Sequence, residues 1–162
     1  MNEFYSFRNE KCPVCKENKL DIIQMPYEIP YFGKCMISVV SCDSCKYRNN
    51  DVISLENFGT VKHTIEVAKS EDLNIRVIKS ASGKVIIPGI IEMIEHEGYV
   101  TNIEGLIVRA MNAIRTANDT HKVKALIDLL IRVIEGKEKL TIIIEDLEGN
   151  SGIISENFKA SN

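Results

Sequence analysis

The sequence predicts a mainly β protein of the α+β class, in which a zinc ribbon precedes a second group of strands that carries a helical hairpin. Three observations predict this fold. Two C-x-x-C pairs lie within the first 45 residues. Short apolar segments alternate with polar residues over most of the chain, as half-buried strands do. Between residues 101 and 136 the apolar residues instead recur at helical spacing.

The cysteine pairs are Cys12 with Cys15 and Cys42 with Cys45, and 26 residues separate the pairs. A two-residue gap lets one tight turn present both sulfurs to one ion, and Zn²⁺ takes four such thiolates at tetrahedral corners with Zn–S near ~2.3 Å. We therefore predict that these four residues hold a structural Zn²⁺. The gap exceeds the ~15–20 residues of the commonest pattern, so residues 20–41 are predicted to form two strands joined by a Pro/Gly loop.

Other uses of the thiols fit the sequence less well. The cysteine count, five, is odd, and no export signal is recognisable, which argues against a disulfide framework. A redox pair needs a strand before the C-x-x-C and a helix after it, whereas Pro13 stands among turn-forming residues. A catalytic zinc keeps an open position that four thiolates would close. Cys35, the fifth cysteine, is predicted to be a buried strand residue, because no neighbouring base is evident.

The remainder of the amino-terminal module, residues 1–58, carries weaker signals. The backbone after the second cysteine of each pair tends to be left-handed, which places Lys16 and Lys46 in that conformation. The segment 49–51 (Asn-Asn-Asp) predicts a turn, with a third strand beginning at Val52. Residues 1–9 contain aromatic residues but show no periodicity. A boundary is expected at residues 57–59.

The second module, residues 59–162, begins with strand patterns. We predict strands over residues 61–67, 73–78, 85–88 and 90–94, with a turn at residues 80–83. Two further strands are expected near the end, over residues 140–144 and 151–154, separated by a turn at residues 145–150. This spacing favours an all-β scaffold over repeated βαβ units.

Two helices interrupt these strands. The sequence Thr101-Asn102-Ile103-Glu104 predicts a capping box in which Thr101 is the N-cap. One apolar stripe follows it (Ile103, Leu106, Ile107, Ala110, Met111 and Ile114), and a second lies further on (Val123, Leu126, Ile127, Leu130 and Ile134). Gly136 is suited to end the second helix. A three-residue link implies an antiparallel helical hairpin at about residues 101–136.

Composition and charge argue against several classes of function. No apolar run approaches the ~18–20 residues that span a bilayer, so no membrane association is expected and a cytoplasmic location is favoured. The net charge is −3, and the sequence lacks the basic stripe of a nucleic-acid-binding domain. This argues against a nucleic-acid-binding ribbon in transcription or translation, which is the alternative function. His63, His96 and His121 are too far apart to form a metal motif, and no nucleophile or phosphate-binding motif occurs. The chain is expected not to be an enzyme.

The cysteine pairs and the residues after them resemble the ZPR-type zinc-finger family. In that family the second pair is followed by an aromatic residue and Arg-Asn-Asn-acidic-Val, as in SCDSCKYRNNDV here. The likeness continues through residues 76–80, 86–88 and 101–106 and through DLEGNS at residues 146–151, and it covers roughly residues 10–155. Relatives often have Gly where this chain has Lys16 and Lys46. The chain has one copy of the module, as archaeal members do, whereas eukaryotic members have two.

The resemblance implies that the zinc ribbon is joined to a double-stranded β-helix, or jelly-roll-like, domain. It also implies a non-catalytic protein-interaction function, because eukaryotic relatives bind translation elongation factor 1-alpha and are associated with its folding. On this interpretation two segments contact the partner (Tyr47, Arg48, Asn49 and Asn50; Asp146, Gly149, Asn150 and Ser151). Arg suits that role because it offers a planar fork of donors, and Asn suits it because its amide offers a donor beside an acceptor. The alternative is that both segments are purely structural turns.

Overall fold

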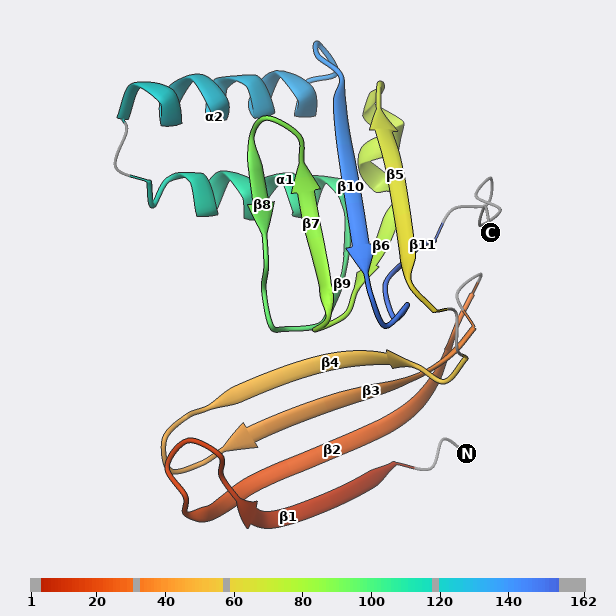
Figure 1. Ribbon diagram of the computed structural model, residues 1–162, viewed down its shortest axis with the longest axis vertical. Helices are drawn as coiled ribbons and strands as arrows, with labels where there is room; N and C mark the ends of the chain where they lie inside the picture. Colours follow the sequence, from red (N-terminus) through yellow and green to blue (C-terminus); the bar gives the residue numbers. More distant parts are fainter. Residues whose placement is uncertain (1–3, 31–32, 57–58, 118–119, 155–162) are drawn as a thin grey trace.

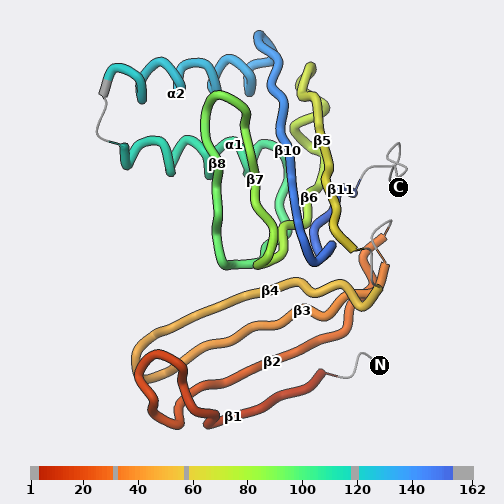
Figure 2. The backbone as a smooth tube through the Cα atoms, in the orientation of Figure 1, coloured from red at the N-terminus to blue at the C-terminus, as the bar shows by residue number. Residues whose placement is uncertain are grey.

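The computed structural model describes residues 4–30, 33–56, 59–117 and 120–154. The described residues form two units, an elongated antiparallel sheet and a two-sheet unit that carries a helical hairpin (Figure 1). The two units lie side by side, and strand β4 of the elongated sheet is the strand that faces the second unit (Figure 2). No helix among the described residues is long and apolar enough to cross a membrane.

The elongated sheet is the ribbon, and its strand order is β1-β2-β3-β4. Strands β2 (Asn18–Ile29) and β3 (Gly33–Cys42) pair over ten residues, from Leu20 with Cys42 to Ile29 with Gly33. They are the two long strands that the sequence predicts. The connecting loop falls partly on residues 31 and 32, which lie outside the described residues. Strands β1 (Tyr5–Lys11) and β4 (Arg48–Ser54) are the two edges of this sheet.

One prediction for the ribbon is wrong, and one of its strands was not predicted. Residues 49–51 are not a turn but part of β4, where Asn49 pairs with Val40 and Asn50 pairs with Val39. The turn after Cys42 is complete by Tyr47, so the following residues are free to pair with β3 at once. Residues 5–11, which show no periodicity, form the edge strand β1. All seven residues of β1 are exposed, so neither face imposes an apolar alternation that the sequence could display.

The second unit has two sheets facing each other across one core, which is the expected jelly-roll arrangement. One sheet has the order β5-β10-β7-β8 and the other β11-β6-β9. Their bounds are β5 (Val61–Val67), β6 (Arg76–Lys79), β7 (Gly83–Ile87), β8 (Ile91–Met93), β9 (Tyr99–Asn102), β10 (Leu140–Asp146) and β11 (Gly152–Ile154). The strand predicted over residues 73–78 is only partly correct, because a 3₁₀ helix (Ser70–Asn74) precedes β6.

The helical hairpin is formed by α1 (Ile103–Ile114) and α2 (Thr120–Ile134), which lie antiparallel beside the sheets (Figure 1). All six residues of the predicted α1 stripe are buried. The N-cap, however, is Asn102 and not Thr101: the Asn102 side chain accepts a hydrogen bond from the Gly105 amide at 2.8 Å. Helix α2 ends at Ile134, and Gly136, the predicted stop signal, follows it with a φ of 71°.

The ribbon is attached to the second unit through a small apolar cluster. Ile78 of β6 is fully buried against Ile29, Cys35 and Val52 of the ribbon. Its neighbour Val77 points to the opposite face of the sheet and joins the main core. Strand β6 therefore lies between the two cores and ties the ribbon to the jelly roll. Cys35 is fully buried there, as the sequence predicts.

Candidate metal centre

The two C-x-x-C turns have the same backbone hydrogen bonds. In the first turn the Cys12 amide donates to the Glu17 carbonyl at 2.9 Å and the Lys16 amide donates to the Cys12 carbonyl at 3.0 Å. In the second, Cys42 donates to Tyr47 at 2.8 Å and Lys46 donates to Cys42 at 3.0 Å. Lys16 and Lys46 are both left-handed, with φ of 66° and 61°, as predicted. Each turn therefore presents its two sulfurs in the same way.

Together the two turns bring four sulfurs to one point. The Sγ atoms of Cys12, Cys15, Cys42 and Cys45 all lie within 4.8 Å of one another. The Cys12–Cys45 and Cys15–Cys42 separations are both 3.7 Å. A tetrahedral ion with Zn–S bonds of ~2.3 Å requires S···S separations of about 3.8 Å. The four sulfurs therefore fit Zn²⁺, and among the described residues no other group of His, Cys, Asp and Glu could hold a metal.

The protonation of these thiols also suits a cation. Desolvation would raise the pKa of Cys12, but hydrogen bonds from the Cys15 and Val14 amides lower it to about 7. For Cys15, the hydrogen bond from the Glu17 amide lowers the pKa. Burial and the neighbouring sulfurs outweigh it and raise the pKa of Cys15 to about 12. Neighbouring thiolates repel one another, so the sulfurs do not ionise together without a compensating positive charge. A divalent ion supplies that charge and closes the four-thiolate shell.

The metal centre rests on a small core of its own. Leu20 is buried beside Cys12 and Cys42, and Tyr47 is half-buried against the same cluster. A side-chain hydrogen bond from Ser44 Oγ to Glu17 Oε2, 2.6 Å long, joins the second turn to the first. Strand pairing adds a further constraint, because Leu20 lies opposite Cys42. The metal therefore fixes the end of the ribbon farthest from the cluster around Ile78.

Of the predicted partner-binding residues in the ribbon, Arg48 and Asn50 are exposed and Tyr47 and Asn49 are half-buried. Directly paired residues of an antiparallel sheet share a face. Val39 pairs with Ile23 on one side and with Asn50 on the other. Arg48, two residues before Asn50, pairs with Ser41 and lies on the same face. We call Ile23, Val39, Arg48 and Asn50 the ribbon patch. The exposed fractions of Ile23 and Val39 are 47% and 40%, and no sequence signal marks these two apolar residues as exposed.

The second predicted segment, residues 146–151, is mostly internal. Asp146, Asn150 and Ser151 are buried, and a side chain at Gly149 would collide with the Gly59 carbonyl oxygen. This segment does expose Leu147 and Glu148 at its tip, and the exposed fraction of Leu147 is 79%. Asn150 reaches the ribbon, because its Oδ1 accepts a hydrogen bond from the Ser54 amide at 2.9 Å. The structure thus brings the two predicted segments to the same junction without placing their side chains on one surface.

A second bond crosses this junction near the predicted motif. Asp51, which follows Asn50, accepts a hydrogen bond from the Ala81 amide at 2.8 Å. The sequence did not single out Ala81 or Gly98, although both contact the ribbon. It also did not single out Lys79, which is completely buried. The sequence did hold a signal for its burial. Side chains two residues apart in a strand point to the same face, so Lys79 lies on the inner face with Val77.

Comparisons with known proteins agree with this architecture. A family model described as the ZPR1 zinc-finger domain matches residues 3–58, and one described as the ZPR1 jelly-roll domain matches residues 71–162. A ZPR1-like protein of Pyrococcus horikoshii, named as uncharacterized, is 37% identical over 164 residues, which cover 92% of this chain and 74% of the relative.

Eukaryotic relatives are similar over part of their length. The human zinc finger protein ZPR1 is 30% identical over 139 residues, which cover 76% of this chain and 30% of the human protein. A Schizosaccharomyces pombe protein named zinc finger chaperone zpr1 is 29% identical over 137 residues, which cover 77% of this chain and 30% of that protein. This chain therefore corresponds to about a third of each eukaryotic protein.

Proposed function

Because this chain belongs to the ZPR1 family, we propose that it is a non-catalytic, zinc-stabilised protein-binding module that acts as a folding factor for translation elongation factor 1-alpha. The chaperone name of the S. pombe relative supports a folding role, and the family resemblance supports the choice of partner. Since this partner works in translation, we place the module in the cytoplasm.

The ribbon patch is the observation that carries this proposal. Apolar side chains that remain exposed on a sheet are typical of protein-binding sites when polar residues border them. Ile23 and Val39 form the apolar centre, and Arg48 and Asn50 stand beside them on the same face. Arg is enriched among the residues that contribute most to protein–protein affinity, and its guanidinium matches carboxylates of a partner.

The other predicted residues support the patch rather than extend it. Tyr47 packs against the metal core and Asn49 lies on the opposite face, so both fix the strand that carries Arg48 and Asn50. Buried Asp146, Asn150 and Ser151 shape the second turn, and Gly149 allows its close approach to Gly59. Leu147, at the tip of that turn, is the side chain that we assign to partner contact there.

A binding measurement with purified elongation factor 1-alpha tests the patch. Val39→Asp places a charge at the apolar centre and Arg48→Ala removes the guanidinium; we expect each to weaken binding by about tenfold or more, the effect of losing a central contact. Arg132→Ala is the matched control, because Arg132 is an exposed arginine on α2 that forms an ion pair with Glu138 at 3.6 Å. Zinc content must equal that of the wild type in every variant.

The folding role needs a separate readout. We expect the wild-type module to raise the yield of active elongation factor recovered from denaturant, and Val39→Asp to lose this effect in proportion to its loss of binding. Equal affinity for wild type and Val39→Asp would exclude the ribbon patch as the binding surface. Tight binding without any gain in refolding yield would leave a binding module and exclude the folding factor.

A further inference from the structure

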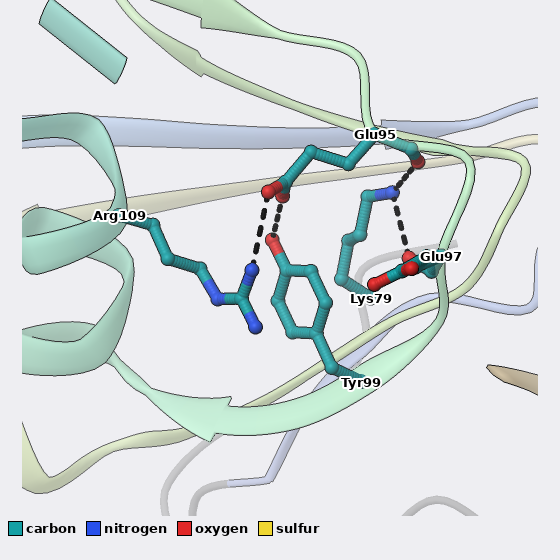
Figure 3. Close-up of polar contacts among 5 residues, drawn as sticks. All are labelled: Lys79, Glu95, Glu97, Tyr99 and Arg109. Carbon is teal, nitrogen blue, oxygen red and sulfur yellow. Dashed lines mark hydrogen bonds and ion pairs between the residues drawn. The ribbon is translucent and has the colours of Figure 1, made fainter. Parts of the chain in front are cut away.

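A buried lysine holds the loop between β8 and β9. Lys79 is completely buried, and its Nζ donates hydrogen bonds to the backbone carbonyl oxygens of Glu95 and Glu97, the latter at 3.1 Å (Figure 3). Its carboxylate neighbours come from three different segments, namely Glu95, Asp51 and Asp146. Burial lowers the pKa of Lys79, and so does the nearby Arg109 guanidinium, whereas these three carboxylates raise it. The ammonium thus has two carbonyl acceptors and three carboxylates near it, together with one other cation.

The Glu95 side chain fixes the same loop from the other side (Figure 3). Its Oε2 accepts a hydrogen bond from the Tyr99 hydroxyl at 2.7 Å, and its Oε1 pairs with Arg109 Nη1 at 3.1 Å. The Arg109 guanidinium lies 3.9 Å from the centre of the Tyr99 ring, and Lys79 Nζ lies 5.5 Å from it. The loop is thus held through its backbone by Lys79 and through a side chain by Tyr99 and Arg109.

The end of this loop touches the ribbon. The Gly98 amide donates a hydrogen bond to the Asn50 carbonyl oxygen at 2.6 Å. The approach is so close that a Cβ atom on residue 98 would lie 2.7 Å from Asp51 Cα and 2.8 Å from Val52 N. Real Cβ atoms do not make such contacts with backbone, so any side chain at this position would have to displace either the loop or β4.

We propose that residues 94–98 form a latch that fixes the ribbon against the jelly roll, and that Lys79 is the positioning residue that holds this latch in place. A buried cation is weak support for stability, because an apolar side chain of similar size is often as stable or more so. Fixing one arrangement of two packed units is a better-attested role for such a group. The latch is independent of which partner the ribbon patch binds.

Hydrogen exchange of the full-length, zinc-loaded protein tests the latch. In Gly98→Ala we expect the amides of β4 to exchange about tenfold faster or more, since the added Cβ must move the loop off the strand. Lys79→Met, which keeps an unbranched side chain of nearly the same length without the ammonium group, should produce the same change in β4. Tyr99→Phe, which loses only the hydroxyl bond to Glu95, should give a smaller change. His96→Ala, at an exposed position in the same loop, is the matched control and should give none.

The double variant separates a latch from a residue that merely stabilises the core. If Lys79 acts through the loop, adding Lys79→Met to Gly98→Ala will not increase the exchange of β4 further, because the contact is already lost. Additive effects in β4 would overturn the positioning role. If Lys79→Met abolishes folding of the jelly roll, as seen by fast exchange in β10, Lys79 is a core residue and its positioning role is overturned. Gly98→Ala with exchange in β4 equal to that of His96→Ala would overturn the latch.

Discussion

At the scale of single residues, Asp146 organises the turn that precedes the last strand. Its Oδ2 accepts hydrogen bonds from the hydroxyls of Ser80 and Ser151 at 2.6 and 2.7 Å. Its Oδ1 accepts from the Ser82 hydroxyl at 2.7 Å and from the Glu148 amide at 2.9 Å. Burial would raise the pKa of Asp146, but these hydrogen bonds lower it below its ordinary value. The carboxylate is therefore held charged by four donors.

Asp146→Asn should reduce the free energy of unfolding by about 2 kcal/mol at neutral pH, because an amide offers one acceptor oxygen where the carboxylate offers two. A group whose folded pKa is depressed contributes stability above its unfolded pKa and loses it as pH falls through its folded pKa. The gap between wild type and Asn variant should thus be full above about pH 4 and narrow below it. Denaturant titrations across this pH range measure the gap.

Ser82→Ala is the control for this prediction, because it removes one of the four donors and leaves the carboxylate. Its cost should be about 1 kcal/mol, the typical value for one hydrogen bond. An Asn variant as stable as wild type at pH 7 would show that the charge of Asp146 is not needed for the turn.

At the scale of secondary-structure elements, the start of α1 shows how a cap is chosen. Thr101 and Asn102 both suit an N-cap, and the sequence alone favoured Thr101 because Glu104 completes a capping box with it. In the structure strand β9 runs on through both residues, because Thr101 pairs with Val77 and Asn102 pairs with Arg76 in sheet β11-β6-β9. The helix therefore begins one residue later, and Asn102 becomes the cap.

Asn102→Ala should lower the free energy of unfolding by about 1 kcal/mol, the usual cost of losing an N-cap side chain. Asn102→Asp should cost much less, since a carboxylate caps a helix equally well. Thermal unfolding of the two variants side by side provides the measurement. Equal losses in both would indicate that the Asn102 amide group, and not its cap oxygen, is what the fold requires.

The α1 stripe from Ile103 to Ile114 buries one side of its helix, so apolar periodicity reveals it. The long pair β2–β3 was predicted instead from the spacing of the cysteine pairs and the Pro/Gly loop between the strands. Strand β1 buries neither side and was missed. Residues 49–51 were misread because Asn and Asp favour turns in general, whereas here Asn50 and Asp51 bond to the jelly roll. Such contacts depend on residues far away in sequence, such as Gly98 and Ala81, and could not be predicted from local pattern.

At the scale of the whole molecule, the chain has two cores that depend on different forces. The jelly roll buries a continuous apolar cluster of strand and helix residues. The far end of the ribbon buries little more than Leu20, Cys12 and Cys42. A core this small does not offset the conformational entropy of ordering the strands around it, so the metal must supply the difference. Structural Zn²⁺ contributes on the order of 10–16 kcal/mol in small domains.

Removing zinc with a chelator should therefore unfold the ribbon and leave the jelly roll folded. We expect exchange protection to be lost in β2 and β3 and kept in α1 and β10, with Cys42→Ser giving the same pattern and a reduced zinc content. Cys35→Ser is the matched control: Cys35 is buried but donates to the Tyr27 carbonyl at 3.2 Å, far from the metal, so zinc content should not change. A metal-free protein with a fully protected ribbon would contradict this account.

The two edge strands of the ribbon, β1 and β4, differ in their surroundings, and this difference has a consequence for self-association. Strand β4 lies against the second unit, where the Asn50 carbonyl and the Ser54 amide bond to Gly98 and Asn150, and β1 is the opposite edge of the sheet. The backbone of β1 is irregular, because Asn9 has a φ of 57° and the pairing with β2 shifts register between Phe7 and Glu10. Fibril-forming segments need about six or seven uninterrupted residues. The irregular backbone at Asn9 therefore makes the β1 edge a poor template for the addition of a strand from another chain.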